Sequence, residues 1–363
     1  MNTKVAADES TEPDKDSWKG SFAIPENQEE WNLLQKAGKL TKTTINTLSK
    51  MASGSKVFRK QFVTFRAIWP FPLETTKLLD FKADYGLHTT WERAEQIAHS
   101  SVELAKYLQL VSSKTPSGTL TEADPRWAGS FMSVLRYQED CLDEVPGTST
   151  GRTRKRATRH RIPWMARSEQ ADDNMTEYQA TDEAIVNSAL LLYLEAVTAL
   201  AGTLSVKWTI RRLTFSPYFS AGRFRTVTDG AMVDKFGDLP HALVEVKKNS
   251  LAHTEESRIA IPMQITAEIV GLLRKHDTTC FLEGHHLMVS QFANEIFLMF
   301  AKAPTSYKGY LDVGVVNPND FLVIQKYSPW RVNNEEDMQC LATVIISVFR
   351  WTLQHMVGCL KVD

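Results

Sequence analysis

Hydrophobic residues recur every three or four positions along several segments of the chain, a spacing typical of amphipathic helices. In the clearest of these segments, 90–111, Thr90 could cap the first turn. Another segment begins near residue 181, with Thr181 or Asp182 as its N-cap. The predicted helices cover residues 29–34, 44–51, 90–111, 181–200, 261–275 and 335–356.

Alternating or short apolar runs follow residue 206 and predict strands between the later helices. The predicted strands cover residues 207–215, 223–233 with a kink at Gly230, 242–246, 286–292, 295–301 and 321–325. The runs 286–292 and 295–301 predict a hairpin about Ala293 and Asn294. Strands interleaved with helices predict an α+β, α/β-like fold with a mixed central sheet flanked by helices.

Changes in composition divide the chain into four predicted regions. Residues 1–20 are acidic and poor in bulky apolar side chains, so we expect a disordered tail. A helical region follows over 21–145, then a basic linker over 146–175, and the mixed α+β core over 176–363.

Charge and cysteine content limit the class of protein and the cellular compartment that we expect. The 363 residues include 42 Lys and Arg against 43 Asp and Glu, a net charge of −1, which excludes a uniformly basic coat for nucleic acid. The sequence has no apolar run of membrane-spanning length and no secretory signal at its N-terminus. The four cysteines are widely spaced, so we expect an intracellular protein, nuclear or cytoplasmic and not secreted.

A run of basic residues within 146–175 is the strongest local charge feature. It could be a solvated loop, a phosphate contact or a nuclear localisation signal. Lys248 is a further basic residue that could touch phosphate. The basic candidates for nucleic-acid contact are Arg152, Arg154, Lys155, Arg156, Arg159, Arg161 and Lys248.

The segment 226–250 carries the candidate chemistry. One predicted strand delivers Asp229, and the next delivers Glu245 and Lys247, which project from the same face because they are two residues apart. If the strands are neighbours, two carboxylates converge beside an ammonium. Mg²⁺ or Mn²⁺ would relieve the repulsion between the carboxylates.

Two further polar residues could complete such a site. Gln264, on the following helix, could contact the metal shell or its water, and Glu183, near the start of the preceding helix, could be a third acidic ligand. Lys247 could orient the attacking water or stabilise charge on phosphate. The metal would be held by Asp229, Glu245 and Glu183.

This ordered series resembles the PD-(D/E)XK nuclease superfamily, and more closely a group of fungal PD-(D/E)XK nuclease-like proteins. The features that carry the resemblance are TDEAIVN at 181–187, TDG at 228–230, EVK at 245–247, Arg258, MQITAEIV at 263–270 and QKYSPW at 325–330. One departure is Thr228, which stands where the family name has proline. Glu195, on the same predicted helix, is an alternative to Glu183 as the acidic residue; Glu183 with Asn187 is preferred because position 195 falls further into the apolar stretch.

The resemblance implies a restriction-endonuclease-like core and Mg²⁺- or Mn²⁺-dependent hydrolysis of phosphodiester bonds in nucleic acid, in DNA rather than RNA. Nuclease folds also serve without catalysis. A catalytically inactive module that binds nucleic acid or a protein partner is therefore the alternative.

Overall fold

The structure, a computed structural model, describes residues 18, 21–142, 182–202, 205–234, 239–250, 254–276 and 281–359. Of the predicted acidic tail over 1–20 only Trp18 is described, and it is buried with its ring against Phe22. The basic run from Arg152 to Arg161 lies outside the described residues.

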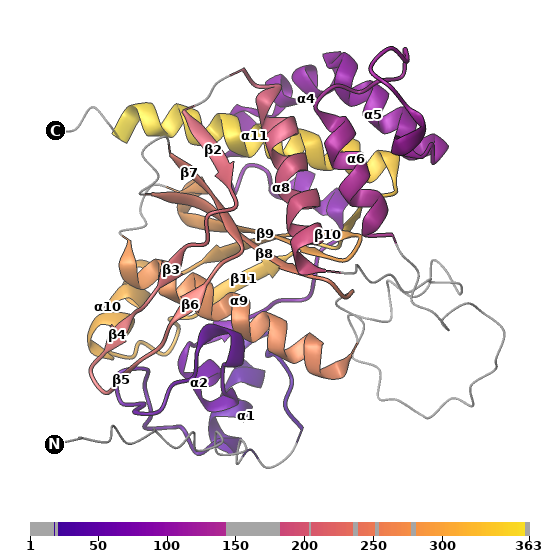
Figure 1. Ribbon diagram of the computed structural model, residues 1–363. Coiled ribbons are helices and arrows are strands. Elements are labelled where there is room, and N and C mark those ends of the chain that lie inside the picture. The colour runs from indigo at the N-terminus through magenta and orange to yellow at the C-terminus, as the bar shows by residue number, and fades with distance from the viewer. Residues whose placement is uncertain are drawn as a thin grey trace, which may run out of the picture.

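A mixed sheet forms the centre of the molecule (Figure 1), with strand order β1-β11-β10-β9-β8-β7-β2 and β12 paired with β10. The pairs β1/β11 and β8/β9 are parallel, and the other pairs are antiparallel. Its strands are β1 Ala67–Ile68, β2 Val206–Thr209, β7 Gly230–Asp234, β8 Pro240–Lys247, β9 His285–Phe292, β10 Glu295–Lys302, β11 Leu322–Lys326 and β12 Trp330–Arg331. The prediction of an α+β fold with a mixed central sheet is thus confirmed.

Helices cover both faces of this sheet (Figure 1). On one face lie α3 Leu78–Phe81, α4 Trp91–Ser100, α5 Val102–Ser113, α6 Phe131–Asp140, α8 Glu183–Ala199 and α11 Glu335–Cys359. On the other lie α1 Gln28–Ala37, α2 Arg59–Thr64, α9 Glu255–Lys275 and α10 Thr305–Val313. The result is three layers with one hydrophobic core on each side of the sheet.

Short elements complete the described chain. Two small antiparallel ribbons pair β3 Thr214–Phe215 with β6 Thr226–Val227 and β4 Tyr218–Phe219 with β5 Gly222–Arg223. Single 3₁₀ turns occupy Gly54–Lys56, Thr75–Lys77, Leu87–Thr89, Ser117–Thr119 and Leu282–Gly284.

Strand β8 divides the two cores. Val244 and Val246 belong to the core on the α8 and α11 side, whereas Leu243 belongs to the core under α9. Because successive side chains of a strand point to opposite faces, Glu245 and Lys247 leave the sheet on the α9 side with Leu243. The candidate site therefore borders the α9 core.

Capping side chains set where the two helices next to the site begin. Asp182, one of the two predicted caps, accepts a hydrogen bond from the Ala184 amide at the start of α8, and Thr254 accepts one from the Ser257 amide at the start of α9. Each cap satisfies an amide that has no partner within its helix.

Four predicted elements differ from the structure. Residues 44–51, predicted as a helix, form turns and irregular chain. The helix over 90–111 is broken at Ser101, whose extended backbone separates α4 from α5 and whose side chain caps α5. The strand predicted over 207–215 is two strands, β2 and β3, in different sheets. The strand predicted over 223–233 consists of separate short strands, and β7 begins at Gly230.

Candidate functional site

Strand β8 presents Glu245 and Lys247 beside β9 in parallel register, Glu245 opposite Ser290 and Lys247 opposite Phe292. The Glu245 side chain is only 1% exposed, and the Lys247 side chain is 24% exposed. Glu245 thus lies inside the protein, and Lys247 reaches from it toward the surface.

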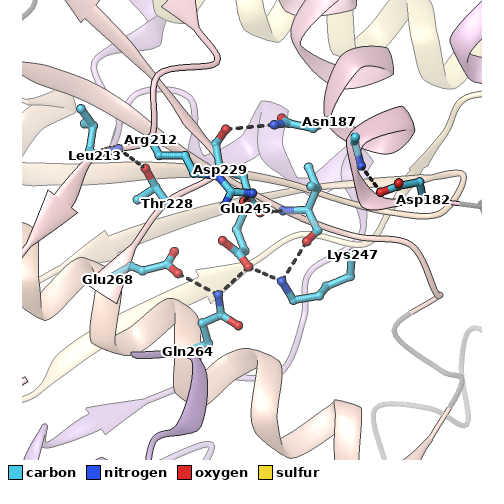
Figure 2. A network of polar contacts seen from close by, with 12 residues as sticks. Asp182, Asn187, Arg212, Leu213, Thr228, Asp229, Glu245, Lys247, Gln264 and Glu268 are labelled. Carbon is cyan, nitrogen blue, oxygen red and sulfur yellow. Dashed lines mark hydrogen bonds and ion pairs between the residues drawn. The ribbon is translucent and has the colours of Figure 1, made fainter. Parts of the chain in front are cut away.

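Asp229 lies in the bend just before β7, and the backbone holds it against β8. Its amide donates to the Val244 carbonyl at 2.9 Å, and its Oδ2 accepts from the Val246 amide at 3.1 Å. On the other side, Asn187 of α8 donates to the Asp229 carbonyl at 3.0 Å (Figure 2). Contacts from strand β8 and from helix α8 therefore hold Asp229 in place.

The second oxygen of Asp229 meets a cation. Arg212 Nη2 lies 3.2 Å from Asp229 Oδ1, and the Arg212 side chain is 65% exposed. The Asp229 side chain is only 12% exposed, so Arg212 is the exposed partner of a largely buried carboxylate. A cation that binds Asp229 Oδ1 would have to replace this ion pair.

Glu245 is the centre of the polar network in Figure 2. Its Oε1 accepts from Lys247 Nζ at 2.5 Å and from Gln264 Nε2 at 2.6 Å. Lys247 Nζ also donates to the Val246 carbonyl at 2.9 Å. The structure thus brings Glu245, Lys247 and Gln264 into direct contact, with Asp229 bonded to the neighbouring residue of the same strand.

The sequence analysis did not name Glu268 as a site residue, although it belongs to this network. It lies one helical turn after Gln264 on α9, is 0% exposed, and accepts from Gln264 Nε2 at 3.0 Å. The signal was present in the sequence, because residues four apart on a helix share a face. Figure 2 shows the carboxyl groups of Glu245 and Glu268 on either side of the Gln264 amide nitrogen.

Burial dominates the electrostatics of the two glutamates. It raises the pKa of Glu245 to about 8, against the opposing effect of Lys247 and with a further rise from Asp229. Burial, and then the charge of Glu245, raise the pKa of Glu268 well above its ordinary value. Two buried carboxyl groups this close do not ionise together, so the pair holds a proton at neutral pH. The proton belongs on Glu268, because Glu245 has the ammonium of Lys247.

Lys247 remains a cation in this setting. Burial alone would lower the pKa of its ammonium, but the charges of Glu245, Glu183 and Asp229 together raise it. A positive charge is thus held permanently at the half-open side of the cluster.

The remaining predicted residues lie farther out. Glu183 is the first residue of α8 and is exposed, and it acts on the cluster through its effect on the pKa of Lys247. Lys248 is half-buried and directly follows β8. The six basic residues from Arg152 to Arg161 lie outside the described residues.

Beneath α9, the buried oxygens Glu245 Oε2, Glu268 Oε2 and Ser290 Oγ lack a hydrogen-bond donor within the described part of the chain, as does Asn187 Oδ1 on the other side of Asp229. Carboxylate and hydroxyl oxygens are hard donors of the kind that Mg²⁺ and Mn²⁺ prefer. The described residues contain no group of three or more His, Cys, Asp or Glu side chains arranged to hold a metal ion. Mg²⁺ is nevertheless commonly bound through only one or two carboxylates, with water and substrate oxygens completing its shell.

Comparisons of the chain with protein-family models, with curated proteins and with solved structures found no match. No helix within the described ranges is both long enough and apolar enough to cross a membrane. Function is therefore inferred from the residues of the site itself.

Proposed function

We propose that this chain is a Mg²⁺- or Mn²⁺-dependent nuclease of the PD-(D/E)XK type that hydrolyses phosphodiester bonds, with DNA as its preferred substrate. The observation that supports this most directly is the meeting of Asp229, Glu245, Lys247 and Gln264 at adjacent strand ends and one helix. Acids, an ammonium and a positioning amide are the groups that such a hydrolysis needs.

Each residue has a distinct part in this proposal. Asp229 and Glu245 would hold the cation, which when bound would polarise the phosphoryl group and acidify a water molecule. Lys247 supplies a fixed positive charge next to the negative charge that develops on phosphate. Gln264 keeps Glu245 oriented through the 2.6 Å hydrogen bond to its Oε1.

The test is hydrolysis of single- and double-stranded DNA and of RNA, with Mg²⁺, with Mn²⁺ and with a chelator. Lys247→Ala should reduce cleavage by about 100-fold or more, since it removes charge stabilisation of the transition state. Lys302→Ala is the matched control, because it removes an exposed lysine at the end of β10, outside the network. Cleavage by Lys247→Ala at the wild-type rate, with circular dichroism showing both variants folded, would contradict the catalytic proposal.

A catalytically inactive binding module is the second candidate, favoured by one observation. Both carboxylate oxygens of Asp229 already have protein partners, Arg212 and the Val246 amide. In an inactive module this arrangement would be structural. Calorimetry separates the two proposals, because the nuclease proposal requires Mn²⁺ binding that Asp229→Asn weakens, and the inactive module requires none.

A further inference from the structure

Three elements direct unpartnered oxygens toward one region beneath α9. Glu245 comes from β8, Ser290 from β9 and Glu268 from α9. Their side chains are 1%, 0% and 0% exposed. The Cα atoms of Glu245 and Ser290 are register partners in a parallel pair, so the two side chains leave the sheet on the same face, next to each other.

Such a concentration of unsatisfied groups is costly. A buried polar atom without a partner destabilises a protein by about 1–3 kcal/mol. A proton shared between Glu245 and Glu268 gives the two carboxyl groups a hydrogen bond to each other, but it leaves Ser290 Oγ without a partner in the described residues. A divalent cation would serve as partner to oxygens of both carboxyl groups at once.

We infer that Glu268 is a ligand of the divalent cation, paired with Glu245, and that it takes the place the sequence had given to Glu183. The inference rests on the proposed function, since it concerns the cation of that same site. Ser290 adds a neutral oxygen to the set.

The contacts of each glutamate explain the preference. Glu268 and Glu245 both accept from Gln264 Nε2, at 3.0 Å and 2.6 Å, which keeps their carboxyl groups within a short distance of one another. Glu183 is exposed at the first turn of α8, and its effect on the cluster is through charge. Glu245 Oε1 is occupied by Lys247 and Gln264, so Oε2 is the oxygen left for a cation, and Lys247 need not leave.

The test measures Mn²⁺ binding directly, by the electron paramagnetic resonance signal of free Mn²⁺ in titrations of the full chain, with no nucleic acid present. Glu268→Gln keeps the shape of the side chain and its acceptor for Gln264. Glu183→Gln is the matched control. Ser290→Ala removes one oxygen without changing charge and serves as a second variant if Glu268→Gln does not fold.

We expect Glu268→Gln to weaken Mn²⁺ binding by about tenfold or more, and Ser290→Ala by a smaller factor, while Glu183→Gln binds like wild type. The melting temperature should also rise with Mn²⁺ in wild type, and rise less at the same Mn²⁺ concentration in Glu268→Gln. Equal Mn²⁺ affinity in wild type and Glu268→Gln would overturn the inference, as would an absence of binding in wild type. Mn²⁺ binding without hydrolysis of any nucleic acid would instead remove the nuclease proposal and leave the ligand assignment standing.

Discussion

The protonated pair of Glu245 and Glu268 predicts an unusual dependence of stability on pH, which Glu268→Gln should abolish. The pKa of Glu245 is raised from 4.5 to about 8, and that of Glu268 is raised well above 4.5. At pH values between 4.5 and about 8, the folded state keeps a proton that the unfolded state has released. Raising the pH therefore favours unfolding, and the stability that this proton supports is lost as pH rises through the folded-state pKa.

The magnitude follows from one proton. Each pH unit changes the free energy of unfolding by about 1.4 kcal/mol per proton, so three units amount to about 4 kcal/mol. In Glu268→Gln the carboxyl group that holds this proton is replaced by a neutral amide, while Glu245 keeps Lys247 as its counter-ion. The stability of the variant minus that of wild type should thus increase by up to about 4 kcal/mol between pH 5 and pH 8.

Urea unfolding followed by tryptophan fluorescence, in the presence of a chelator, provides the measurement. Glu183→Gln should run parallel to wild type at every pH, because Glu183 is exposed. Burial lowers the pKa of His241 and of His286 to about 4, and their effects cancel in the difference between variant and wild type. A difference between Glu268→Gln and wild type that stays constant from pH 5 to pH 8 would refute the reasoning.

Three further substitutions test how the site is held, each by urea unfolding at pH 7. Gly230→Ala should cost about 1–3 kcal/mol, since its Cβ would lie 2.7 Å from the Thr209 carbonyl oxygen in the neighbouring strand; a neutral effect would mean that β2 gives way freely. Asn187→Ala should lower the free energy of unfolding by about 1–2 kcal/mol, because it leaves the buried Asp229 carbonyl without its 3.0 Å donor. An unchanged free energy of unfolding would show that this hydrogen bond does not stabilise the fold. Tyr193→Phe removes a 2.7 Å hydrogen bond to a carbonyl of α11 and should cost about 1 kcal/mol, whereas a gain would count against that bond.

Periodicity in the sequence was sufficient to place much of the site. The alternation of strand β8 puts Glu245 and Lys247 on one face, and its pairing with β7 brings Asp229 to the same place, as the sequence argument required. The apolar spacing of α9 likewise predicted its helix, and Gln264 reaches Glu245 from it. These residues lie on one strand, on the strand next to it and on the following helix. Their arrangement could therefore be predicted from the sequence pattern alone.

Hydrophobic periodicity gave no information about residues that lie outside regular helices and strands. Arg212 lies in the irregular stretch between β2 and β3, which the sequence pattern had merged into one strand, so its ion pair with Asp229 had no periodic signal. Strand β1 consists of only Ala67–Ile68 and joins the sheet beside β11, far along the chain. A two-residue strand has too little pattern to predict, because its position is set by tertiary packing.

The composition of the α9 core gives a physical reason to regard the cluster as functional. Neighbouring positions on the same layer, such as Leu243 and Ile265, are apolar and fully packed. Apolar side chains of similar volume at 245 and 268 would close this core without unsatisfied oxygens, and replacing buried charged groups in this way is often neutral or stabilising. The chain instead buries two carboxyl groups, each with an oxygen that lacks a partner in the described structure. A fold optimised for stability alone has no use for such groups, whereas a cation site needs both of them.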